Sequence, residues 1–344
     1  MALWTDVIDP ATLTGYARAS LEEYEQRKGS LASFLPNEQV EDINVRLNVG
    51  NGGLVESAHF RAFDAEPEYG AVEAGRRKNF ELAAVSQKFA LSEYDRLRAR
   101  NASDEAVLNV VRRTTERAVT AVSDAVELLR GEVIATAKAT IDYGRAGVVV
   151  DDFERDADMS VTAGTLWSDG AAKPLNDLLS YVQAYGVKNG EAPGTLVLSN
   201  RVLGALSQHA SLNTQLVNGA NRPATLDDVR SLLSSYGIPN IQVRDRKVRR
   251  WNRDTRAAET VSVLPDDSIY LLPAAGNTDL GATFWAPTLG ASEQGYGIAD
   301  GDRAGIVAAV YRNDMPPHIA EVWADAVALP ALVNPNLAMR AKVL

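Results

Sequence analysis

Five carboxylates lie close together between residues 151 and 158, and carboxylates are the ligands that hard cations such as Ca²⁺ prefer. They are Asp151, Asp152, Glu154, Asp156 and Asp158. Their spacing departs from a calcium-binding EF-hand loop, which needs a glycine at its sixth position and a glutamate at its twelfth. We therefore interpret the cluster as a charged surface strand followed by a turn, and we expect no metal site there.

A basic segment from residue 244 to residue 256 contains seven basic and two acidic residues around Trp251. Cations that contact phosphate and an aromatic ring that stacks on a base would make it a nucleic-acid surface. The alternative is a solvated hairpin between two strands, or a salt-bridging contact with an acidic neighbour. The formal net charge of −10 favours this alternative, because a negatively charged chain repels nucleic acid. Arg249 and Arg250 are therefore candidate inter-subunit contacts.

Residues for covalent or metal-assisted catalysis are scarce in this chain. There is no cysteine, which excludes a thiol nucleophile, a disulfide and a thiolate zinc site. The three histidines, His59, His209 and His318, lie far apart in the sequence. Neither a dinucleotide-binding glycine fingerprint nor a nucleophile or zinc-protease motif is present. We predict a protein that is not an enzyme and has no catalytic, cofactor or metal site; the alternative is an α/β enzyme that uses residues 170–300.

Composition indicates a globular chain with one large domain or two of ordinary size. The chain has 344 residues, of which 46% are hydrophobic, and both values are ordinary for folded proteins. The first residues lack the basic and apolar regions of a secretory signal. No hydrophobic run approaches the roughly 20 residues that span a bilayer. We expect a protein that is made in the cytoplasm and has no membrane partner.

One segment of the N-terminal half is difficult to place within a single compact chain. Residues 43–49 alternate between apolar and polar, which predicts a strand. The next roughly 40 residues lack the density of apolar side chains that a core needs. Loops of this length within a compact domain are usually functional or disordered. We predict a two-stranded excursion over 43–90, which cannot be stable alone in water. A neighbouring subunit is the expected cover, so Arg76, Arg77 and Lys78 in this excursion are candidate inter-subunit contacts.

Two helices are predicted on either side of this excursion. Asp9, Pro10 and Gly29 indicate one helix over 11–28, with a cap and a first-turn proline at its start and a glycine at its end. Valine and alanine at helical spacing predict a second helix over 103–139. At 1.5 Å per residue it would be about 55 Å long, which suits either a coiled coil or a helix that lies across a sheet. Several arginines are expected to lie off its apolar stripe: Arg112, Arg113, Arg117 and Arg130.

The rest of the chain predicts an α+β protein. Gly144 and Gly147 indicate a hairpin within 139–165. Helices and strands then alternate from 170 to 300, which is typical of a separate α/β domain. The tail, 301–344, predicts apolar strands, and we expect it to pair with the hairpin of 139–150 and so to return to the earlier domain.

This order of elements resembles the major capsid proteins of tailed bacteriophages, which share the Hong Kong 97 fold. The resemblance covers nearly the whole chain, and several stretches are similar to the lambda-type branch of that family. These are DAEPEYG at 64–70, LVLSNRVLGALSQH at 196–209, TLDDVRSLLSSYGIPNIQVRD at 225–245, LPDDSIYLLP at 264–273 and the closing YRNDMPPHIAEVWADAVALPALVNPNLAMRAKVL.

The resemblance implies a division of the chain into the parts of that fold. These would be an N-terminal arm at 1–42, an extended loop at 43–90, a spine helix at 103–139 within a peripheral domain at 91–169, an axial domain at 170–300, and a C-terminal return to the peripheral domain at 301–344.

The resemblance also implies a function. Pentamers and hexamers would close into the icosahedral head shell around a double-stranded DNA genome, with the extended loop over an adjacent subunit. The protein would be assembled in the host cytoplasm and located in the virion. An encapsulin, which encloses cargo enzymes in a shell of the same fold, is the alternative.

The resemblance implies partners and one chemical question. A separate scaffolding protein is expected, since the chain starts almost directly at its arm; a portal protein, a decoration protein and DNA bound without sequence specificity are the others. Some relatives join subunits by a Lys–Asn isopeptide bond. The residues that raise this question here are Lys78, Lys88, Asn334 and Asn336.

Overall fold

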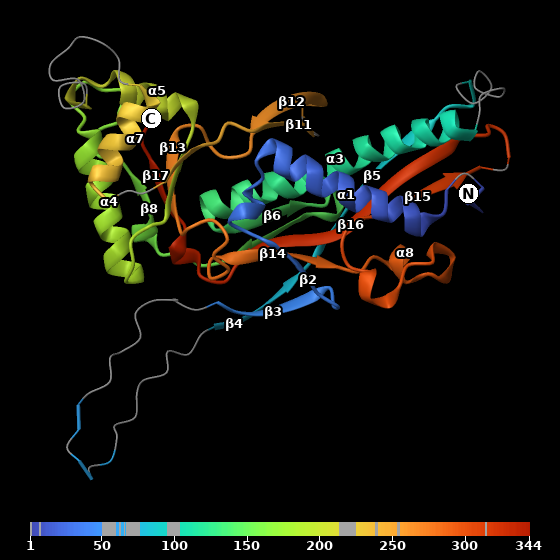
Figure 1. The fold of residues 1–344 in the computed structure, drawn as a ribbon, viewed down its shortest axis with the longest axis horizontal. Coiled ribbons are helices and arrows are strands. Elements are labelled where there is room, and N and C mark those ends of the chain that lie inside the picture. Colours follow the sequence, from blue (N-terminus) through green and yellow to red (C-terminus); the bar gives the residue numbers. More distant parts are fainter. Residues whose placement is uncertain are drawn as a thin grey trace.

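The computed structural model describes residues 2–6, 8–49, 60–61, 63–64, 66, 76–94, 104–212, 225–237, 240–252, 255–313 and 315–344. Its architecture is α+β, with a six-stranded sheet under two helices and a five-stranded sheet that carries further helices. The two sheets lie at opposite ends of the long axis, and a paired segment extends away from both (Figure 1).

A single long strand organises the six-stranded sheet. This strand, β16 (Ala320–Leu332), pairs along one edge with β5 (Ala83–Leu91). Its other edge pairs first with β15 (Val307–Arg312) and then with β14 (Gly281–Ala286). Two short strands complete the sheet: β1 (Ala2–Leu3) beside β15, and β2 (Asn37–Gln39) beside β14. Segments from both ends of the sequence therefore build one sheet.

Helices α1 (Pro10–Lys28) and α3 (Asp104–Thr136) cover one face of this sheet (Figure 1). The helix predicted over 103–139 is confirmed, and its 33 residues correspond to about 50 Å. Side chains at their interface are small: the buried face of β16 presents alanine or valine at every second position from Ala320 to Ala328, and α3 packs valine and alanine side chains against it. Small side chains on both surfaces let the helix lie close along the strand.

The ends of α1 are set by local chemistry, as the sequence predicts. The Asp9 side chain accepts a hydrogen bond of 2.8 Å from the backbone N–H of Thr12, and Pro10 occupies the first turn. Gly29 ends the helix with φ 67°, a left-handed conformation that glycine adopts without steric cost. Caps of this kind depend on neighbouring residues alone.

The five-stranded sheet has the order β10-β9-β13-β17-β8. Its strands are β8 (Ser160–Thr162), β9 (Thr195–Leu198), β10 (Ile241–Val243), β13 (Ser268–Leu272) and β17 (Met339–Lys342). The accompanying helices are α4 (Pro174–Asn189), α5 (Asn200–Gln208) and α7 (Leu226–Ser235), the last with a complete capping box between Thr225 and Asp228. The alternating α/β pattern predicted for this region is confirmed.

Strand pairing differs from the predictions in three places. The tail does not pair with the hairpin of 139–150: β15 and β16 lie in the six-stranded sheet, and β17 joins β13 and β8 in the other. Residues 83–90, which we expected in the excursion, belong to β5 in the six-stranded sheet, and β14 leaves the α/β region to join that sheet as well. Strands pair through main-chain groups that every residue except proline carries, so periodicity does not identify the partner.

In the part of the chain that the structure describes, three two-stranded hairpins stand outside the two large sheets. The first pairs β3 (Asn44–Val49) with β4 (Arg76–Glu81). From here on, the excursion means residues 44–81, a shorter range than the 43–90 predicted from the sequence. The second pairs β6 (Lys138–Asp142) with β7 (Val148–Asp152), as predicted. The third pairs β11 (Lys247–Asn252) with β12 (Ala257–Ser262), and we call residues 247–262 the basic hairpin. The short helix α8 (Leu289–Ser292) lies before β15. Within the described residues, no helix is long and apolar enough to cross a membrane.

A half-buried arginine satisfies the C-terminal end of α3. Arg155 donates hydrogen bonds to the carbonyl oxygens of Ile134 and Ala338 at 2.8 Å each and of Ala135 at 2.6 Å. Burial lowers the pKa of Arg155 to about 10, so the guanidinium remains charged at neutral pH. Its charge lies where the negative end of the helix dipole is found. The same side chain ties α3 to the segment before β17.

We expect Arg155→Met to lower the free energy of unfolding by about 2–3 kcal/mol, because it removes charge-assisted hydrogen bonds and leaves buried carbonyl oxygens unpaired. The measurement is urea unfolding of the unassembled subunit followed by circular dichroism. The control is Arg145→Met, at an exposed position between β6 and β7, which should change stability by less than about 0.5 kcal/mol. Equal effects of the two changes would contradict the role given to Arg155.

Candidate assembly surfaces

The base of the excursion is fixed to the rest of the chain. Phe80 on β4 and Phe153 are both buried, and their rings are 5.0 Å apart at 42°. Beside them, Glu154 binds Arg76 at 2.8 Å and Lys78 at 2.7 Å. The hydrogen bond from Lys78 is the main reason why the pKa of Glu154 is lowered. The packed rings of Phe80 and Phe153, together with the ion pairs of Glu154, therefore fix the orientation of the base of the excursion.

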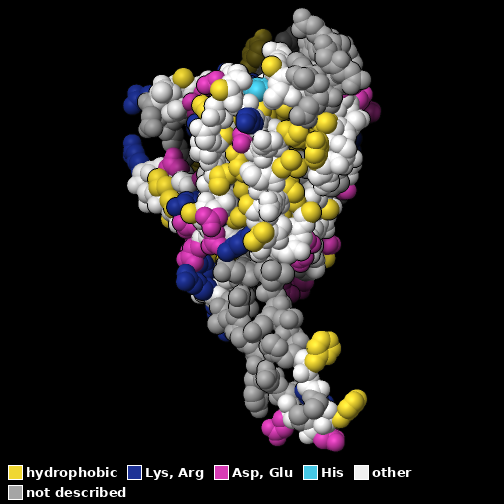
Figure 2. All heavy atoms as spheres, turned by 90° about the vertical axis from the view of Figure 1, so that its left-hand side faces the viewer, with side chains coloured by type: hydrophobic (Ala, Val, Ile, Leu, Met, Phe, Trp, Pro, Cys, Tyr) yellow, Lys and Arg dark blue, Asp and Glu magenta, His cyan; other side chains and the backbone are white. Residues whose placement is uncertain are grey.

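The described residues farther along the excursion are exposed. The exposed fraction of Phe60 is 108% and that of Phe63 is 100%, so neither ring is covered by the part of the chain that the structure describes. Figure 2 shows hydrophobic side chains at the far end of this segment, well away from the main surface. Soluble proteins seldom leave two neighbouring aromatic rings in water without a use for them. The far end of the excursion therefore has the character of a contact surface.

The three basic residues predicted for this segment divide into two roles. Arg76 and Lys78 bind Glu154 within the same chain, and Lys78 also donates to the Asp152 carbonyl oxygen at 2.8 Å. Arg77 lies between them on the strand, is exposed and has no ion pair with any described residue. Residues i and i+2 share one face of a strand and residue i+1 points to the other, so Arg77 is the one of the three whose charge remains available.

Three of the five carboxylates in the acidic cluster at 151–158 form ion pairs with lysine or arginine. Asp152 binds Lys138 at 2.8 Å and Asp156 binds Lys188. Burial acts to raise the pKa of Asp152, but hydrogen bonds from Lys138 and from the backbone N–H of Glu154 outweigh it and lower that pKa. No group of three metal-ligating side chains occurs among the described residues. The three paired carboxylates act within the β6–β7 hairpin, on the excursion and on α4, respectively.

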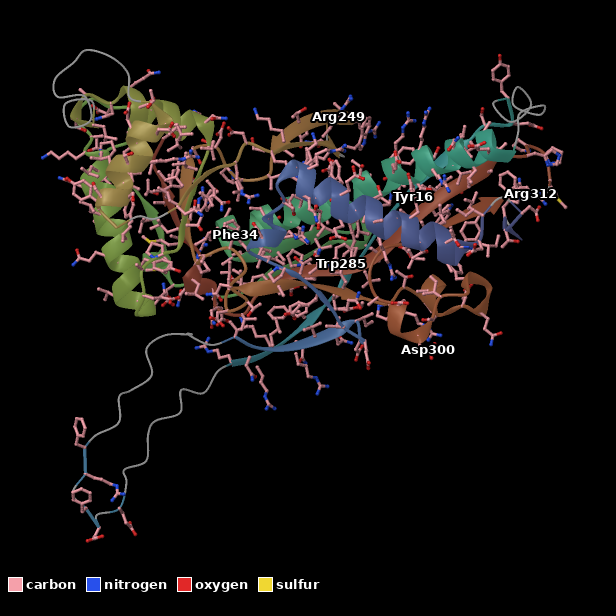
Figure 3. All side chains as sticks on the ribbon, viewed as in Figure 1. Tyr16, Phe34, Arg249, Trp285, Asp300 and Arg312 are labelled. Carbon is pink, nitrogen blue, oxygen red and sulfur yellow. The ribbon has the colours of Figure 1, made fainter. Side chains whose placement is uncertain are left out.

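The basic segment at 244–256 is two structures and not one patch. Arg244 and Arg246 turn inward: Arg244 donates to the Ser30 carbonyl oxygen at 3.0 Å, and Arg246 binds Asp124 on α3 at 2.8 Å. These two side chains hold the basic hairpin to α3 and to the segment after α1. Only the part from Lys247 onward is exposed as a hairpin, as the solvated interpretation predicts (Figure 3, where Arg249 is labelled).

The two arginines predicted as contacts lie on opposite faces of the basic hairpin. Arg250 faces Glu259 across the strand pair and binds it at 2.7 Å, and this contact lowers the pKa of Glu259. Arg249 is exposed and forms no ion pair with any described residue. The sequence analysis gave Arg249 and Arg250 the same role, although alternation along a strand places neighbouring residues on opposite faces.

The residues considered for an isopeptide bond are all engaged within the chain. Lys78 binds Glu154, and Lys88 binds Glu321 at 3.0 Å. Asn334 donates to the Asp279 carbonyl oxygen at 2.9 Å. Asn336 is only 4% exposed and its amide donates to Asp156, so a lysine of another copy cannot reach it in this conformation.

The two histidines that the structure describes have different surroundings. His209 is buried, and its ring nitrogens lie 2.8 Å from the Ser211 hydroxyl and 3.2 Å from the Asp169 carbonyl oxygen. His318 is exposed on the turn before β16. His59 lies outside the described residues.

Sequence reasoning missed a buried charge network on α3. Arg130, expected off the buried stripe, is 0% exposed and binds Glu25 at 2.6 Å and Glu127 at 3.1 Å. The only signal was local: a glutamate and an arginine three positions apart on one helix, next to a glycine. Arginine is almost never fully buried without a partner, which is why Arg130 was expected on the exposed side of the helix. The prediction is wrong because the partner, Glu25, lies more than a hundred residues away in the sequence.

Comparison with known proteins identifies the fold. A phage-related protein from Bordetella bronchiseptica RB50 superposes with a TM-score of 0.61 at 15% identity, covering 97% of this chain and 96% of that one. A protein described as the capsid protein of an E. coli CFT073 prophage gives 0.63 at 14% identity, covering 98% and 99%. A virus-like particle protein from Pyrococcus furiosus gives 0.50 at 11% identity, covering 95% and 98%. No curated protein sequence matches this chain.

The sequence itself matches a family as well as a fold. The family model described as phage major capsid protein E matches residues 15–343. That range contains most of α1, all of α3, the excursion and the whole α/β region. The chain has the Hong Kong 97 type of capsid fold expected from its element order, while its place in the lambda-type branch stays a prediction. Because the match extends over nearly the entire sequence, the chain belongs to the phage major capsid protein E family and is a structural subunit of a capsid.

Proposed function

We propose that this capsid protein forms pentamers and hexamers that close into the icosahedral head shell of a tailed phage around double-stranded DNA. The observation that carries the proposal is the excursion. Its base is fixed by Phe80, Phe153 and Glu154, and its far end exposes Phe60 and Phe63 completely. A segment held firmly at one end and uncovered at the other is suited to lie on an adjacent subunit.

The other elements have roles consistent with this arrangement. The excursion would be the extended loop and α3 the spine helix, while the five-stranded sheet with α4, α5 and α7 would be the axial domain at the centre of each ring. The α/β end of the molecule exposes Val187 and Tyr236, and hydrophobic side chains are visible on that end face in Figure 2. Apolar side chains there would be covered in a closed ring.

The family supports a set of partners for such a shell. We infer that a separate scaffolding protein directs closure, that a portal protein occupies one vertex and that a decoration protein binds the finished surface. Assembly would take place in the host cytoplasm, and the mature protein would be located in the virion with packaged DNA inside. Electron microscopy of the purified protein, alone and with its scaffold, tests the shell, and the nature of the contents separates a phage head from an encapsulin.

Replacing both Phe60 and Phe63 with alanine should prevent closed shells while the subunit remains folded. A central aromatic contact contributes about 2 kcal/mol to an interface, which corresponds to roughly thirty-fold in the association constant. Neither ring is covered by any described residue of its own chain, so the urea midpoint should not move. The measurement is the fraction of protein in particles, by sedimentation and electron microscopy.

The control is Leu289→Ala on α8, a hydrophobic residue that is 88% exposed on the body of the molecule. It should assemble as wild type does. Normal shells from the Phe60→Ala, Phe63→Ala variant would show that the excursion is not an assembly contact.

A further inference from the structure

One face of the basic hairpin concentrates charge that no described residue neutralises. Lys247, Arg249 and Trp251 alternate along β11 and therefore share a face. Trp251 is 64% exposed. Thr260 lies opposite Arg249 and Ala258 opposite Trp251, so the partner strand adds no acid to this face.

The other face of the same hairpin is neutral. There Arg250 binds Glu259, and Asn252 donates to the same carboxylate at 3.1 Å. Among the described residues, neither Lys247 nor Arg249 has an ion pair. The hairpin is thus one-sided: two cations and an exposed indole on one face, and a completed ion pair on the other. Tryptophan and arginine are the side chains enriched at the centres of protein interfaces.

The segment of opposite charge is the excursion. From residue 62 to residue 75 the sequence contains four acidic residues and no lysine or arginine. Asp64 and Glu66, which the structure describes, are exposed there beside Phe63. The excursion leaves one long edge of the molecule and the basic hairpin lies along the opposite edge (Figure 1). In a cyclic ring, one edge of each subunit meets the opposite edge of the next.

We propose that the Lys247–Arg249–Trp251 face of the basic hairpin is the surface on which the acidic end of a neighbouring copy's excursion docks. This inference rests on the proposed function, since it names the receptor for the excursion in the ring. Asp64 and Glu66 meet the two cations, and a phenylalanine of the excursion packs on the indole of Trp251. Exposed ion pairs add little affinity and are screened by salt. Here they would steer the excursion towards the hairpin and fix how the two segments align, while the aromatic contact would bury apolar surface.

The absence of cysteine from the sequence allows a direct test by engineered disulfides, which form only when Cα atoms come within about 7 Å. Glu66→Cys is combined with Thr260→Cys on the proposed face. The matched control combines Glu66→Cys with Ala257→Cys, which is exposed on the other face of the same hairpin. Particles are assembled, oxidised and analysed on non-reducing gels.

A ladder of covalent oligomers from the Thr260→Cys pair, with monomers from the control pair, is the expected result. Particles of normal appearance that give no ladder from Thr260→Cys, or equal ladders from both pairs, overturn the inference while leaving the shell function intact. If wild-type protein forms no particles under any condition, the proposed function itself fails.

Charge reversal gives an independent measurement. Arg249→Glu should reduce the particle fraction about tenfold, equivalent to 1.4 kcal/mol in the contact, and Asp64→Lys with Glu66→Lys in the same chain should restore it. Arg250→Ala, on the other face, should assemble normally. If Arg249→Glu particles form in normal yield but hold less DNA, the face serves nucleic acid and not a second copy, and the inference is overturned.

Discussion

Replacing Arg130 with methionine should lower the free energy of unfolding by about 3–5 kcal/mol, the cost of leaving buried charge without its partner. Arg130 is 0% exposed, and its Nη1 lies 2.6 Å from Glu25 and 3.1 Å from Glu127. Its Nε donates to the Thr283 hydroxyl at 2.9 Å. Without the guanidinium, Glu25 loses this ion pair and Glu127 keeps only the longer contact with Arg246, at 3.4 Å.

The position of Arg130 explains why the loss should be felt throughout the subunit. Glu25 lies on α1, Glu127 on α3 and Thr283 on β14, and Nη2 donates to Asn37 on β2. One side chain therefore joins both helices to one end of the six-stranded sheet. We expect Arg130→Met to give less soluble subunit and few particles.

The measurement is urea unfolding of the unassembled subunit, with Arg250→Met as the exposed control. The exposed ion pair between Arg250 and Glu259 should contribute less than about 1 kcal/mol to the free energy of unfolding, as exposed ion pairs usually do. Adding Glu25→Gln and Glu127→Gln to Arg130→Met should recover part of the loss, because neutral amides are less costly to bury than unpaired carboxylates. A stability change for Arg130→Met no larger than that of Arg250→Met would contradict this account of the network.

The elements that sequence reasoning predicted correctly are those whose causes are local. Asp9, Pro10 and Gly29 lie next to the helix they limit, and the stripe of α3 repeats within each turn, so both helices could be predicted. The pairing of β17 with β13, and of β5 with β16, could not be predicted because the main-chain bonds that define it carry no residue signature. The partners of Arg130 could not be predicted for another reason: Glu25 lies more than a hundred residues away in the sequence, and only the fold brings it beside α3.

The candidate contacts show a similar limit. The segments were correctly chosen as exposed and basic, but their individual residues were not separated. Strand alternation could have distinguished Arg249 from Arg250, and Arg77 from Arg76, had the bounds of β11 and β4 been known. Which arginine is neutralised depends on Glu259 and Glu154, and only the fold shows that these carboxylates lie nearby.

Replacing Gly131 with alanine should destabilise the subunit by about 3 kcal/mol, the upper part of the range for an overfilled interior. Within an α-helix this substitution usually stabilises, by about 1 kcal/mol, because alanine restricts the unfolded chain and favours the helix. At Gly131 a Cβ would lie 2.0 Å from the carbonyl oxygen of Val263 and 2.8 Å from its carbonyl carbon. Those are main-chain atoms, so no rotamer change can relieve the contact.

The close approach at Gly131 has a structural purpose. Val263 follows the basic hairpin directly, and its N–H donates to the Arg246 carbonyl oxygen at 3.0 Å. A glycine at this point of α3 lets the base of the hairpin rest on the helix backbone, beside the ion pair between Arg246 and Asp124. An alanine would push the base away and strain that ion pair, so Gly131→Ala should also displace the face formed by Lys247, Arg249 and Trp251.

The same substitution at a second helical glycine provides the control. A Cβ at Gly15 on α1 would meet no atom within 4 Å, so Gly15→Ala should stabilise the subunit by about 0.5–1 kcal/mol. Urea midpoints of the two variants should therefore move in opposite directions from wild type. If both moved upward, the contact between α3 and Val263 would be loose enough to admit a methyl group, and the hairpin would not depend on Gly131 for its position.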